Sequence, residues 1–172
     1  MHDDTLYPKT KTVLTVLENE SFLSNFYLAG GTALALQIGH RKSIDLDFFT
    51  AEFPSQESLL RDLSQFKPII SQQATGTLDV YIQDVKVSFL DYPYPLINAS
   101  IPYEQIQMAS VLDIACMKIT AISSRGSKKD FVDLYFILKS FTLEQIFSAL
   151  QTKFANTQYQ KFHLLKSLVY FK

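Results

Sequence analysis

Two short groups of residues have the types and spacing that phosphate and metal chemistry require. Gly30-Gly31-Thr32 follows an apolar run, and Asp45-Leu46-Asp47 comes after a helix-length spacer. Adjacent glycines before a helix let backbone N–H groups approach a phosphate without a Cβ in the way, and Thr32 adds a hydroxyl donor. Because strand residues i and i+2 share a face about 6.5–7 Å apart, Asp45 and Asp47 project together. Two aligned carboxylates suit Mg²⁺, which proteins hold with one or two carboxylates plus substrate phosphates.

The elements that position these groups follow from the apolar periodicity. The sequence predicts helices over residues 12–23, 32–38 and 55–66. It predicts strands over 26–29, 44–49, 68–72, 77–82 and 85–90, the last two joined as a hairpin through Gln83-Asp84. Ile44, Leu46 and Phe48 are expected to point toward the core, so that the carboxylates opposite them stand on a rigid strand.

The second half is predicted to be helical. Helices are expected over 110–123 and 127–138, from residue 142, and over 159–170, with Ser or Thr at the N-cap and Asp or Gln three residues later in the first three. The fold class is therefore α/β (α+β), a mixed sheet flanked by helices and followed by a C-terminal helical bundle. Residues 1–105 form the predicted core, and residues 106–172 form a helical part packed on it, with the nucleotide between them. Apolar residues continue almost to Lys172, which leaves open a longer natural chain.

The overall composition excludes several classes of protein. Sixteen basic and seventeen acidic residues give a net charge of −1, which excludes a globally basic nucleic-acid coat and leaves a local basic patch open. A hydrophobic content of 47% supports one folded core. The single cysteine, Cys116, lies in an apolar run and is expected to be a reduced, buried thiol. No segment approaches the ~18 apolar residues of a membrane span and no signal peptide is recognisable, so we expect a cytoplasmic protein without a membrane partner.

A second group of candidate residues is basic and lies in the helical half. Lys118, Arg125 and Lys129 are spaced so that two neighbouring helices would bring them together on a triphosphate or an RNA phosphate. Asp130 completes a capping box with Ser127 or supports this group. Asp133 is expected to pair with Lys129 or Arg125, or to act directly.

Two further cations, Arg41 and Lys42, precede the Asp-x-Asp segment. Arg41 either meets a phosphate or remains a solvated loop cation, because exposed loop cations are mostly solvated.

Gly30-Gly31-Thr32 followed by Asp45-Leu46-Asp47 resembles the signature of the DNA polymerase β-like nucleotidyltransferase superfamily. More narrowly, residues 27–36, 40–49, 118–122 and 125–134 resemble the AbiEii/AbiGii toxin family. The resemblance implies a minimal nucleotidyltransferase fold and transfer of a nucleotidyl group from an NTP with Mg²⁺ or Mn²⁺. It also implies a toxin of a toxin–antitoxin or phage-defence system, with an antitoxin or regulator encoded by an adjacent gene. The acceptor stays open among tRNA 3′ ends, proteins and small molecules.

Carried over to this chain, the resemblance assigns the triphosphate to Gly30-Gly31-Thr32 and the metal to Asp45 and Asp47. In such a site two metal ions about 3.5–4 Å apart share the carboxylates. Enzymes of this kind usually add a third carboxylate from a neighbouring strand.

The sequence departs from that pattern on the strand predicted over 85–90. Val85, Val87 and Phe89 are expected to share the buried face, which leaves Lys86, Ser88 and Leu90 on the opposite face. The position expected to be acidic therefore holds Ser88, and Asp79 or Asp91 would have to substitute for it. The alternative function is therefore a nucleotide-binding or partner-binding module that kept the fold and lost the chemistry. A small-molecule-modifying enzyme resembling aminoglycoside nucleotidyltransferases also stays open.

Overall fold

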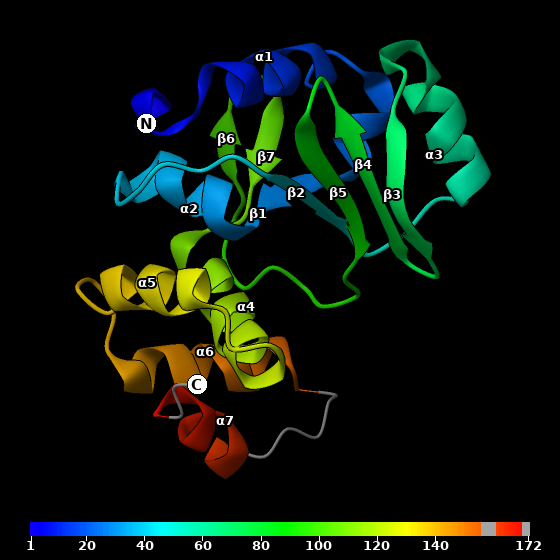
Figure 1. Cartoon of the computed structure of the whole chain (residues 1–172). Helices are drawn as coiled ribbons and strands as arrows, with labels where there is room; N and C mark the ends of the chain where they lie inside the picture. The colour runs from blue at the N-terminus through cyan, green and yellow to red at the C-terminus, as the bar shows by residue number, and fades with distance from the viewer. Residues whose placement is uncertain (156–160, 170–172) are drawn as a thin grey trace. The chain divides into compact units, whose positions relative to one another are not determined.

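The structure is a computed structural model that describes residues 1–155 and 161–169. It divides the chain into two units, whose elements are labelled in Figure 1. The first, here called the sheet unit, comprises Met1–Pro93 and Ser100–Met108. The second, here called the helical unit, comprises Tyr94–Ala99 and the chain from Ala109 onward.

Seven strands form one mixed sheet in the order β3-β4-β5-β2-β1-β7-β6 (Figure 1). The strands are β1 (Tyr27–Ala29), β2 (Leu46–Thr50), β3 (Ile69–Ala74), β4 (Thr77–Ile82), β5 (Val85–Asp91), β6 (Ile101–Tyr103) and β7 (Ile106–Met108). The pairs β2–β5 and β1–β7 are parallel, and the other neighbours are antiparallel. The predicted mixed sheet is confirmed, as is the β4–β5 hairpin, in which Gln83 and Asp84 both have positive φ.

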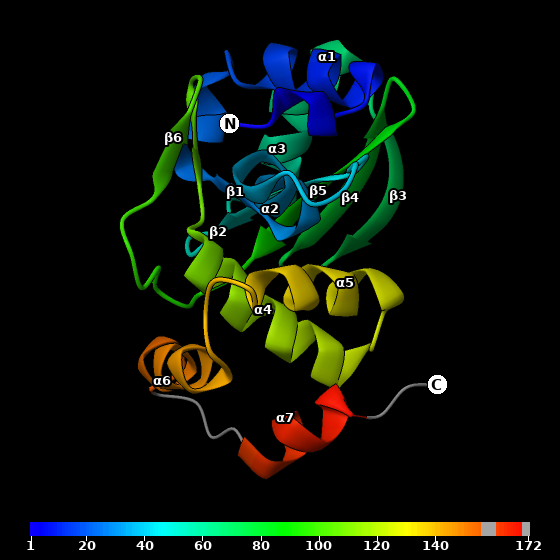
Figure 2. The same cartoon turned by 90° about the vertical axis from the view of Figure 1, so that its left-hand side faces the viewer.

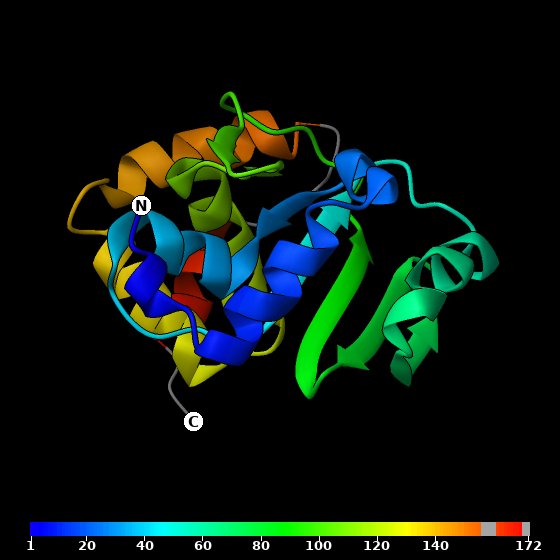
Figure 3. The ribbon, with the colours of Figure 1, turned by 90° about the horizontal axis from the view of Figure 1, so that it is seen from above.

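The sheet unit also contains three α-helices and three short 3₁₀ segments. They are η1 (Asp3–Thr5), α1 (Pro8–Leu17), η2 (Ser21–Asn25), α2 (Gly30–Ile38), α3 (Gln56–Leu63) and η3 (Ser64–Phe66). The helix predicted over residues 12–23 is wrong at both ends. Pro8 starts α1 early because a first-turn residue needs no N–H donor, and the helix stops at Leu17. Figure 3 shows α1 alongside β5, which it contacts.

Strands β6 and β7 contradict the prediction that the second half is entirely helical. They form a hairpin around a turn in which Glu104 has positive φ, and β7 pairs with β1. The predicted boundary between residues 105 and 106 falls inside this hairpin. Each strand has only three residues and β6 contains Pro102, so any alternation is too short to identify a strand.

The apolar face of the sheet carries the aromatic core of this unit. Phe48 and Phe89 stack with ring centroids 5.7 Å apart, and Phe26 meets Phe89 edge-on at 5.3 Å. Val85, Val87 and Phe89 are buried as predicted. The prediction that Ile44 points toward the core is wrong. Ile44 lies before β2 begins and is 49% exposed, so it does not share the core face with Leu46.

The helical unit is built around α4, which α5, α6 and α7 each contact (Figure 2). These helices are α4 (Val111–Ser124), α5 (Lys128–Ile137), α6 (Leu143–Lys153) and α7 (Lys161–Leu168). Two predicted caps are confirmed: the Ser110 hydroxyl accepts from the Asp113 N–H at 3.1 Å, and Thr142 with Gln145 forms a complete capping box. The predicted last helix begins and ends on residues outside the described ones.

Over residues 1–155 and 161–169, the structure contains no helix of the length and apolar character needed to cross a bilayer.

Candidate active site

The start of α2 lies directly against the second aspartate of the Asp-x-Asp segment. Ala29, the last residue of β1, pairs with Asp47 of β2, and Gly30 follows with φ +68°. A Cβ built on Gly30 would lie 2.6 Å from Asp47 Oδ2, closer than any carbon and oxygen can approach without repulsion. The backbone conformation therefore favours glycine at position 30, and a larger residue there would displace the Asp47 carboxylate. The sequence order strand, Gly-Gly-Thr, helix, Asp-x-Asp does bring the two groups together.

Thr32 positions the Asp-x-Asp segment through its hydroxyl. The side chain is 1% exposed, and its Oγ1 contacts Ser43 Oγ at 2.8 Å and donates to the carbonyl oxygen of Asp45. The nucleotide-binding role of Thr32 stays a prediction. Because the hydroxyl is engaged inside the protein, that role would fall to the backbone N–H, which like those of Gly30 and Gly31 belongs to the unsatisfied first turn of α2.

Asp45 and Asp47 supply two half-buried carboxylates at this place. Asp45 lies just before β2 and Asp47 within it. Among the described residues no group of three or more His, Cys, Asp or Glu side chains has a metal-binding arrangement. A carboxylate beside a helix N-terminus, with a second carboxylate two residues earlier, nevertheless suits Mg²⁺ or Mn²⁺, since such ions complete their oxygen shell with substrate phosphates and water.

The third acidic position is occupied by serine, as the sequence indicates. Asp47 pairs in register with Ser88 of β5, and Ser88 pairs with Asp79 of β4, so the three side chains form one row on one face of the sheet. Asp79 is two strand spacings from Asp47, roughly 10 Å. Asp91 is exposed and three residues beyond Ser88, which places it on the opposite face. Neither aspartate takes the position beside Asp47.

Lys86 stands on the same face, two residues before Ser88, and forms an ion pair with Asp79. The distance from Nζ to Asp79 Oδ2 is 2.7 Å, and the Asp79 side chain is only 8% exposed. The hydrogen bond to Asp79 raises the pKa of Lys86 above its ordinary value, against the opposing effect of burial. The charges of Asp47 and Asp45 raise that pKa further. An ammonium group is thus held near the candidate metal ligands.

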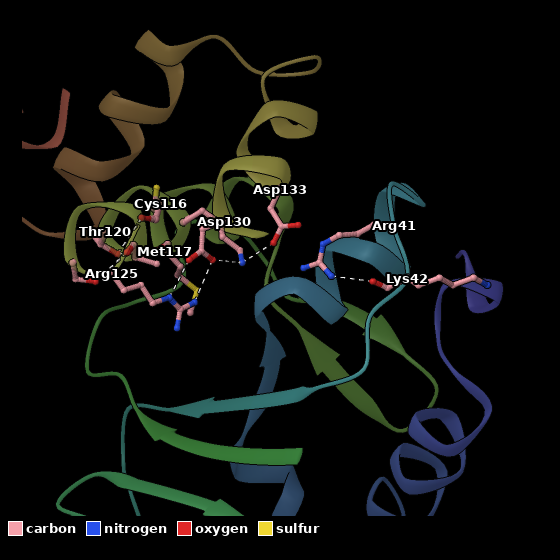
Figure 4. A network of polar contacts seen from close by, with 11 residues as sticks. Arg41, Lys42, Cys116, Met117, Thr120, Arg125, Asp130 and Asp133 are labelled. Atoms are coloured by element: carbon pink, nitrogen blue, oxygen red, sulfur yellow. Dashed lines mark hydrogen bonds and ion pairs between the residues drawn. The ribbon is translucent and has the colours of Figure 1, made fainter. Parts of the chain in front are cut away.

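Arg41 and Lys42 make contacts with backbone carbonyl groups. Arg41 Nη1 donates to the carbonyl of Lys42 at 3.0 Å (Figure 4). Lys42 Nζ donates to the carbonyl of Asp4. Arg41 is half-buried and Lys42 is exposed. A phosphate-binding role for Arg41 stays a prediction.

Asp130 is the centre of a charged network in the helical unit (Figure 4). It accepts from Arg125 Nε at 2.9 Å and Nη2 at 3.2 Å, and from Lys118 Nζ at 2.8 Å. Burial would raise the pKa of Asp130, but the hydrogen bonds from Arg125 and Lys118 outweigh burial and lower it. Ser127 makes no side-chain cap with α5, so Asp130 serves the cations rather than a capping box.

Asp133 binds a different cation from the two that the sequence suggested. Its Oδ2 lies 2.6 Å from Lys118 Nζ, so Lys118 is held between Asp130 and Asp133 and its side chain is 7% exposed. Lys129 is exposed in the first turn of α5. The structure thus joins Lys118 and Arg125 through one carboxylate, while nucleotide binding by these cations stays a prediction.

Comparisons with known proteins identify the family. The sequence model described as "Nucleotidyl transferase AbiEii toxin, Type IV TA system" matches residues 12–104 and 64–167. Uncharacterized protein aq_aa25 of Aquifex aeolicus (strain VF5) is 39% identical over 158 residues, which cover 87% of this chain and 75% of that protein. The chain belongs to the AbiEii nucleotidyltransferase family.

Solved structures show that this AbiEii family member has a nucleotidyltransferase fold. The antibiotic-resistance factor ANT(2'')-Ia, in complex with adenylyl-2''-tobramycin, matches with a TM-score of 0.63 at 12% identity, over 88% of this chain and 100% of that one. JHP933 from Helicobacter pylori matches with a TM-score of 0.55 at 17% identity, over 95% of this chain and 90% of that one. The Megavirus polyadenylate synthase matches with a TM-score of 0.57 at 15% identity, over 76% of this chain and 31% of that one. At these identities the likeness is one of fold.

Sequence reasoning missed several ion pairs of this AbiEii family chain, among them two with a buried carboxylate. Lys86 and Asp79 were not recognised as a pair, although the alternation of β4 and β5 places both on one face. Lys153 and Asp113, both 0% exposed, meet at 2.8 Å, and Asp113 also accepts from the Ile97 N–H at 2.8 Å. No sequence pattern signals the second pair, because its partners are forty residues apart on different helices.

The two units of this AbiEii family chain carry opposite charge. The helical unit has nine basic and four acidic residues, which give a net charge of +5. The sheet unit has seven basic and thirteen acidic residues, which give a net charge of −6. A surface pocket of about 500 Å³ in the helical unit is lined by Arg125, His163 and Lys166 together with serine hydroxyls. The near-zero net charge of the whole chain therefore conceals a basic helical unit.

Proposed function

We propose that this chain is an Mg²⁺-dependent nucleotidyltransferase that transfers an NMP group from an NTP to a hydroxyl acceptor. The observation that carries the proposal is the contact between Gly30 and Asp47, where a Cβ would lie 2.6 Å from the carboxylate. By that contact the first turn of α2, which favours phosphate, lies beside the Asp47 carboxylate, which favours a divalent cation.

Each residue of the sheet unit has a defined part in this proposal. The backbone N–H groups of Gly30-Gly31-Thr32 bind the triphosphate, and Thr32 holds Asp45 in place through its carbonyl. Asp45 and Asp47 hold Mg²⁺ or Mn²⁺, which when bound neutralises charge on the triphosphate and on the leaving pyrophosphate. The acceptor oxygen forms a bond to the α-phosphorus, the bond from that phosphorus to the β-phosphate oxygen breaks, and the hydroxyl proton passes to solvent.

The helical unit contributes cations to nucleotide binding in this proposal. Arg125 and Lys129 bind phosphate oxygens, and Asp130 orients Arg125 through two hydrogen bonds. Lys118 is fixed by Asp130 and Asp133, so its charge acts from a buried position. The excess of positive charge in this unit supports binding of a phosphate-bearing ligand.

A biological role follows from the description of the family. The chain would be the toxin of a type IV toxin–antitoxin or phage-defence system, with an antitoxin or regulator encoded next to it. Growth arrest on expression, relieved by the neighbouring gene, supports this role. An adjacent gene that neither encodes a regulator nor relieves toxicity contradicts it.

The acceptor is one of three classes: RNA, with tRNA as a candidate, a protein or a small molecule. The neighbouring structures include a polyadenylate synthase and a factor solved with an adenylylated aminoglycoside. Incubation with labelled NTPs, Mg²⁺ and separate RNA, protein and small-molecule fractions identifies which class becomes labelled.

The decisive comparison uses wild type and the isosteric variant Asp45→Asn/Asp47→Asn. Label transfer by wild type and its loss in the folded variant support the enzyme. NTP binding by wild type without transfer to any fraction would instead favour a nucleotide-binding module, for which the serine at position 88 is the motivating observation.

A further inference from the structure

The row of side chains beside the candidate metal ligands contains a cation where a carboxylate is expected. Asp47, Ser88 and Asp79 occupy paired positions on three adjacent strands. Lys86 shares their face and reaches the far end of the row, where its Nζ lies 2.7 Å from Asp79 Oδ2. The side chain of Lys86 is 36% exposed, so solvent reaches part of it.

The charge at this place differs from that of a site built for two divalent cations. Two ions about 3.5–4 Å apart need carboxylates that bridge them, and among the described residues no third carboxylate is grouped with Asp45 and Asp47. Lys86 and Asp45 directly precede the paired residues Val87 and Leu46, and an ammonium on this face repels a second divalent ion and attracts phosphate oxygens. The hydrogen bond to Asp79 and the charges of Asp47 and Asp45 raise the pKa of Lys86, against the opposing effect of burial, so these carboxylates favour the charged ammonium.

We propose that Lys86 is a catalytic residue of this site, whose ammonium binds a non-bridging oxygen of the α-phosphate and replaces a second divalent cation. Asp79 is the positioning residue that holds Lys86 in place. The inference rests on the proposed function, because it assigns a role within the same site. Lys86 remains protonated throughout: it stabilises the negative charge that develops on the α-phosphate while the acceptor oxygen bonds to phosphorus and pyrophosphate leaves.

A pair of binding measurements tests Lys86 without turnover. In Lys86→Met, Mn²⁺ alone should bind about threefold more tightly, because a competing cation beside the two aspartates is gone. Inorganic tripolyphosphate in the presence of Mn²⁺ should bind about tenfold more weakly, because a charge-assisted contact is lost. Calorimetry measures both, and one bound Mn²⁺ per chain is expected in wild type with tripolyphosphate.

The sheet unit offers a matched control pair. Lys9 Nζ lies 2.8 Å from Asp84 Oδ2, on the turn of the same β4–β5 hairpin, and both side chains are largely exposed. Lys9→Met removes one lysine charge and one Lys–Asp pair from the sheet unit, and it should change neither affinity. Two bound Mn²⁺ ions in wild type, or equal effects of the two substitutions, would overturn the proposal.

An activity measurement separates catalysis from support of the fold. Lys86→Met leaves the Asp79 carboxylate buried without its cation and is expected to lower stability, whereas Asp79→Asn/Lys86→Met removes both charges and should restore the thermal midpoint. If Lys86 acts on substrate, kcat stays roughly 100-fold low in the stable double variant. Lys86→Arg, which keeps the positive charge, should recover part of the lost kcat. Full activity in the double variant would show that Lys86 serves only to neutralise Asp79.

The outcomes also separate this inference from the proposed function. If wild type transfers no nucleotide, the proposed function fails, while the opposite changes in Mn²⁺ and tripolyphosphate affinity still test Lys86. If wild type is active and Lys86→Met binds both probes like wild type, the assignment of Lys86 fails and the nucleotidyltransferase stands.

Discussion

Replacing Gly30 by alanine tests the close approach of α2 to Asp47. Alanine at φ +68° costs about 1–2 kcal/mol of folding free energy relative to glycine. Its Cβ would also lie 2.6 Å from Asp47 Oδ2, so the carboxylate must move by nearly 1 Å. We expect a total loss of about 2–3 kcal/mol, a fall in thermal midpoint of roughly 5–10 °C. A displacement of that size in a catalytic group typically lowers the rate about 100-fold.

Gly126→Ala is the matched control for this prediction. Gly126 also has a positive φ of +59°, but the nearest atom to its added Cβ, the carbonyl oxygen of Ile122, is 3.7 Å away. Both variants should lose the backbone contribution of about 1–2 kcal/mol in thermal unfolding. Only Gly30→Ala should lose Mn²⁺ binding in calorimetry. Equal Mn²⁺ affinities in the two variants would refute a contact between Gly30 and a metal ligand.

Three further substitutions probe the helical unit. Arg125→Ala should weaken triphosphate binding about tenfold in a calorimetric titration. The thermal midpoint should move by less than about 4 °C, because the Arg125 side chain is 66% exposed. A large loss of stability would show that Arg125 is structural. Asp130 has a lowered pKa, so its contribution to stability is full above pH ~4–5 and lost as the pH falls through its folded-state pKa. Asp130→Asn should cost about 2–3 kcal/mol at pH 7, and the free energy of unfolding, measured with urea at a series of pH values, should fall less steeply at acid pH. An unchanged fall at acid pH would contradict this. Lys153→Met leaves Asp113 fully buried without its cation and should cost about 3–5 kcal/mol in urea unfolding; a loss below 1 kcal/mol would show that the pair adds little.

The strand and turn pattern of the sheet unit could be predicted because it depends on local sequence. Alternation placed Val85, Val87 and Phe89 on the core face, and that assignment left Ser88 at the third acidic position. The hairpin at Gln83-Asp84 follows from the two-residue spacing between two alternating runs, and of the two turn residues only Asp84 is of a type enriched at positive φ. The structure agrees in each case, because periodicity and turn chemistry act over only a few residues.

Features that depend on distant residues could not be predicted in the same way. The hairpin of β6 and β7 owes its place to β1, about eighty residues earlier. Asp133 was expected to pair with a neighbour in sequence, yet it binds Lys118, whose position depends on how α4 packs against α5. The pair of Lys86 and Asp79 combines both cases: the face is predictable from alternation, and the contact depends on strand register.

Transfer from two differently labelled nucleotides tests whether this chain transfers an NMP group. The protein is incubated with Mg²⁺, an acceptor fraction and NTP labelled either at the α- or at the γ-phosphate. We expect acid-stable label on the acceptor from the α-labelled NTP only, release of one pyrophosphate per transfer, and no transfer by Asp45→Asn/Asp47→Asn. Label from the γ-phosphate on the acceptor, or undiminished transfer by the double variant, would contradict it.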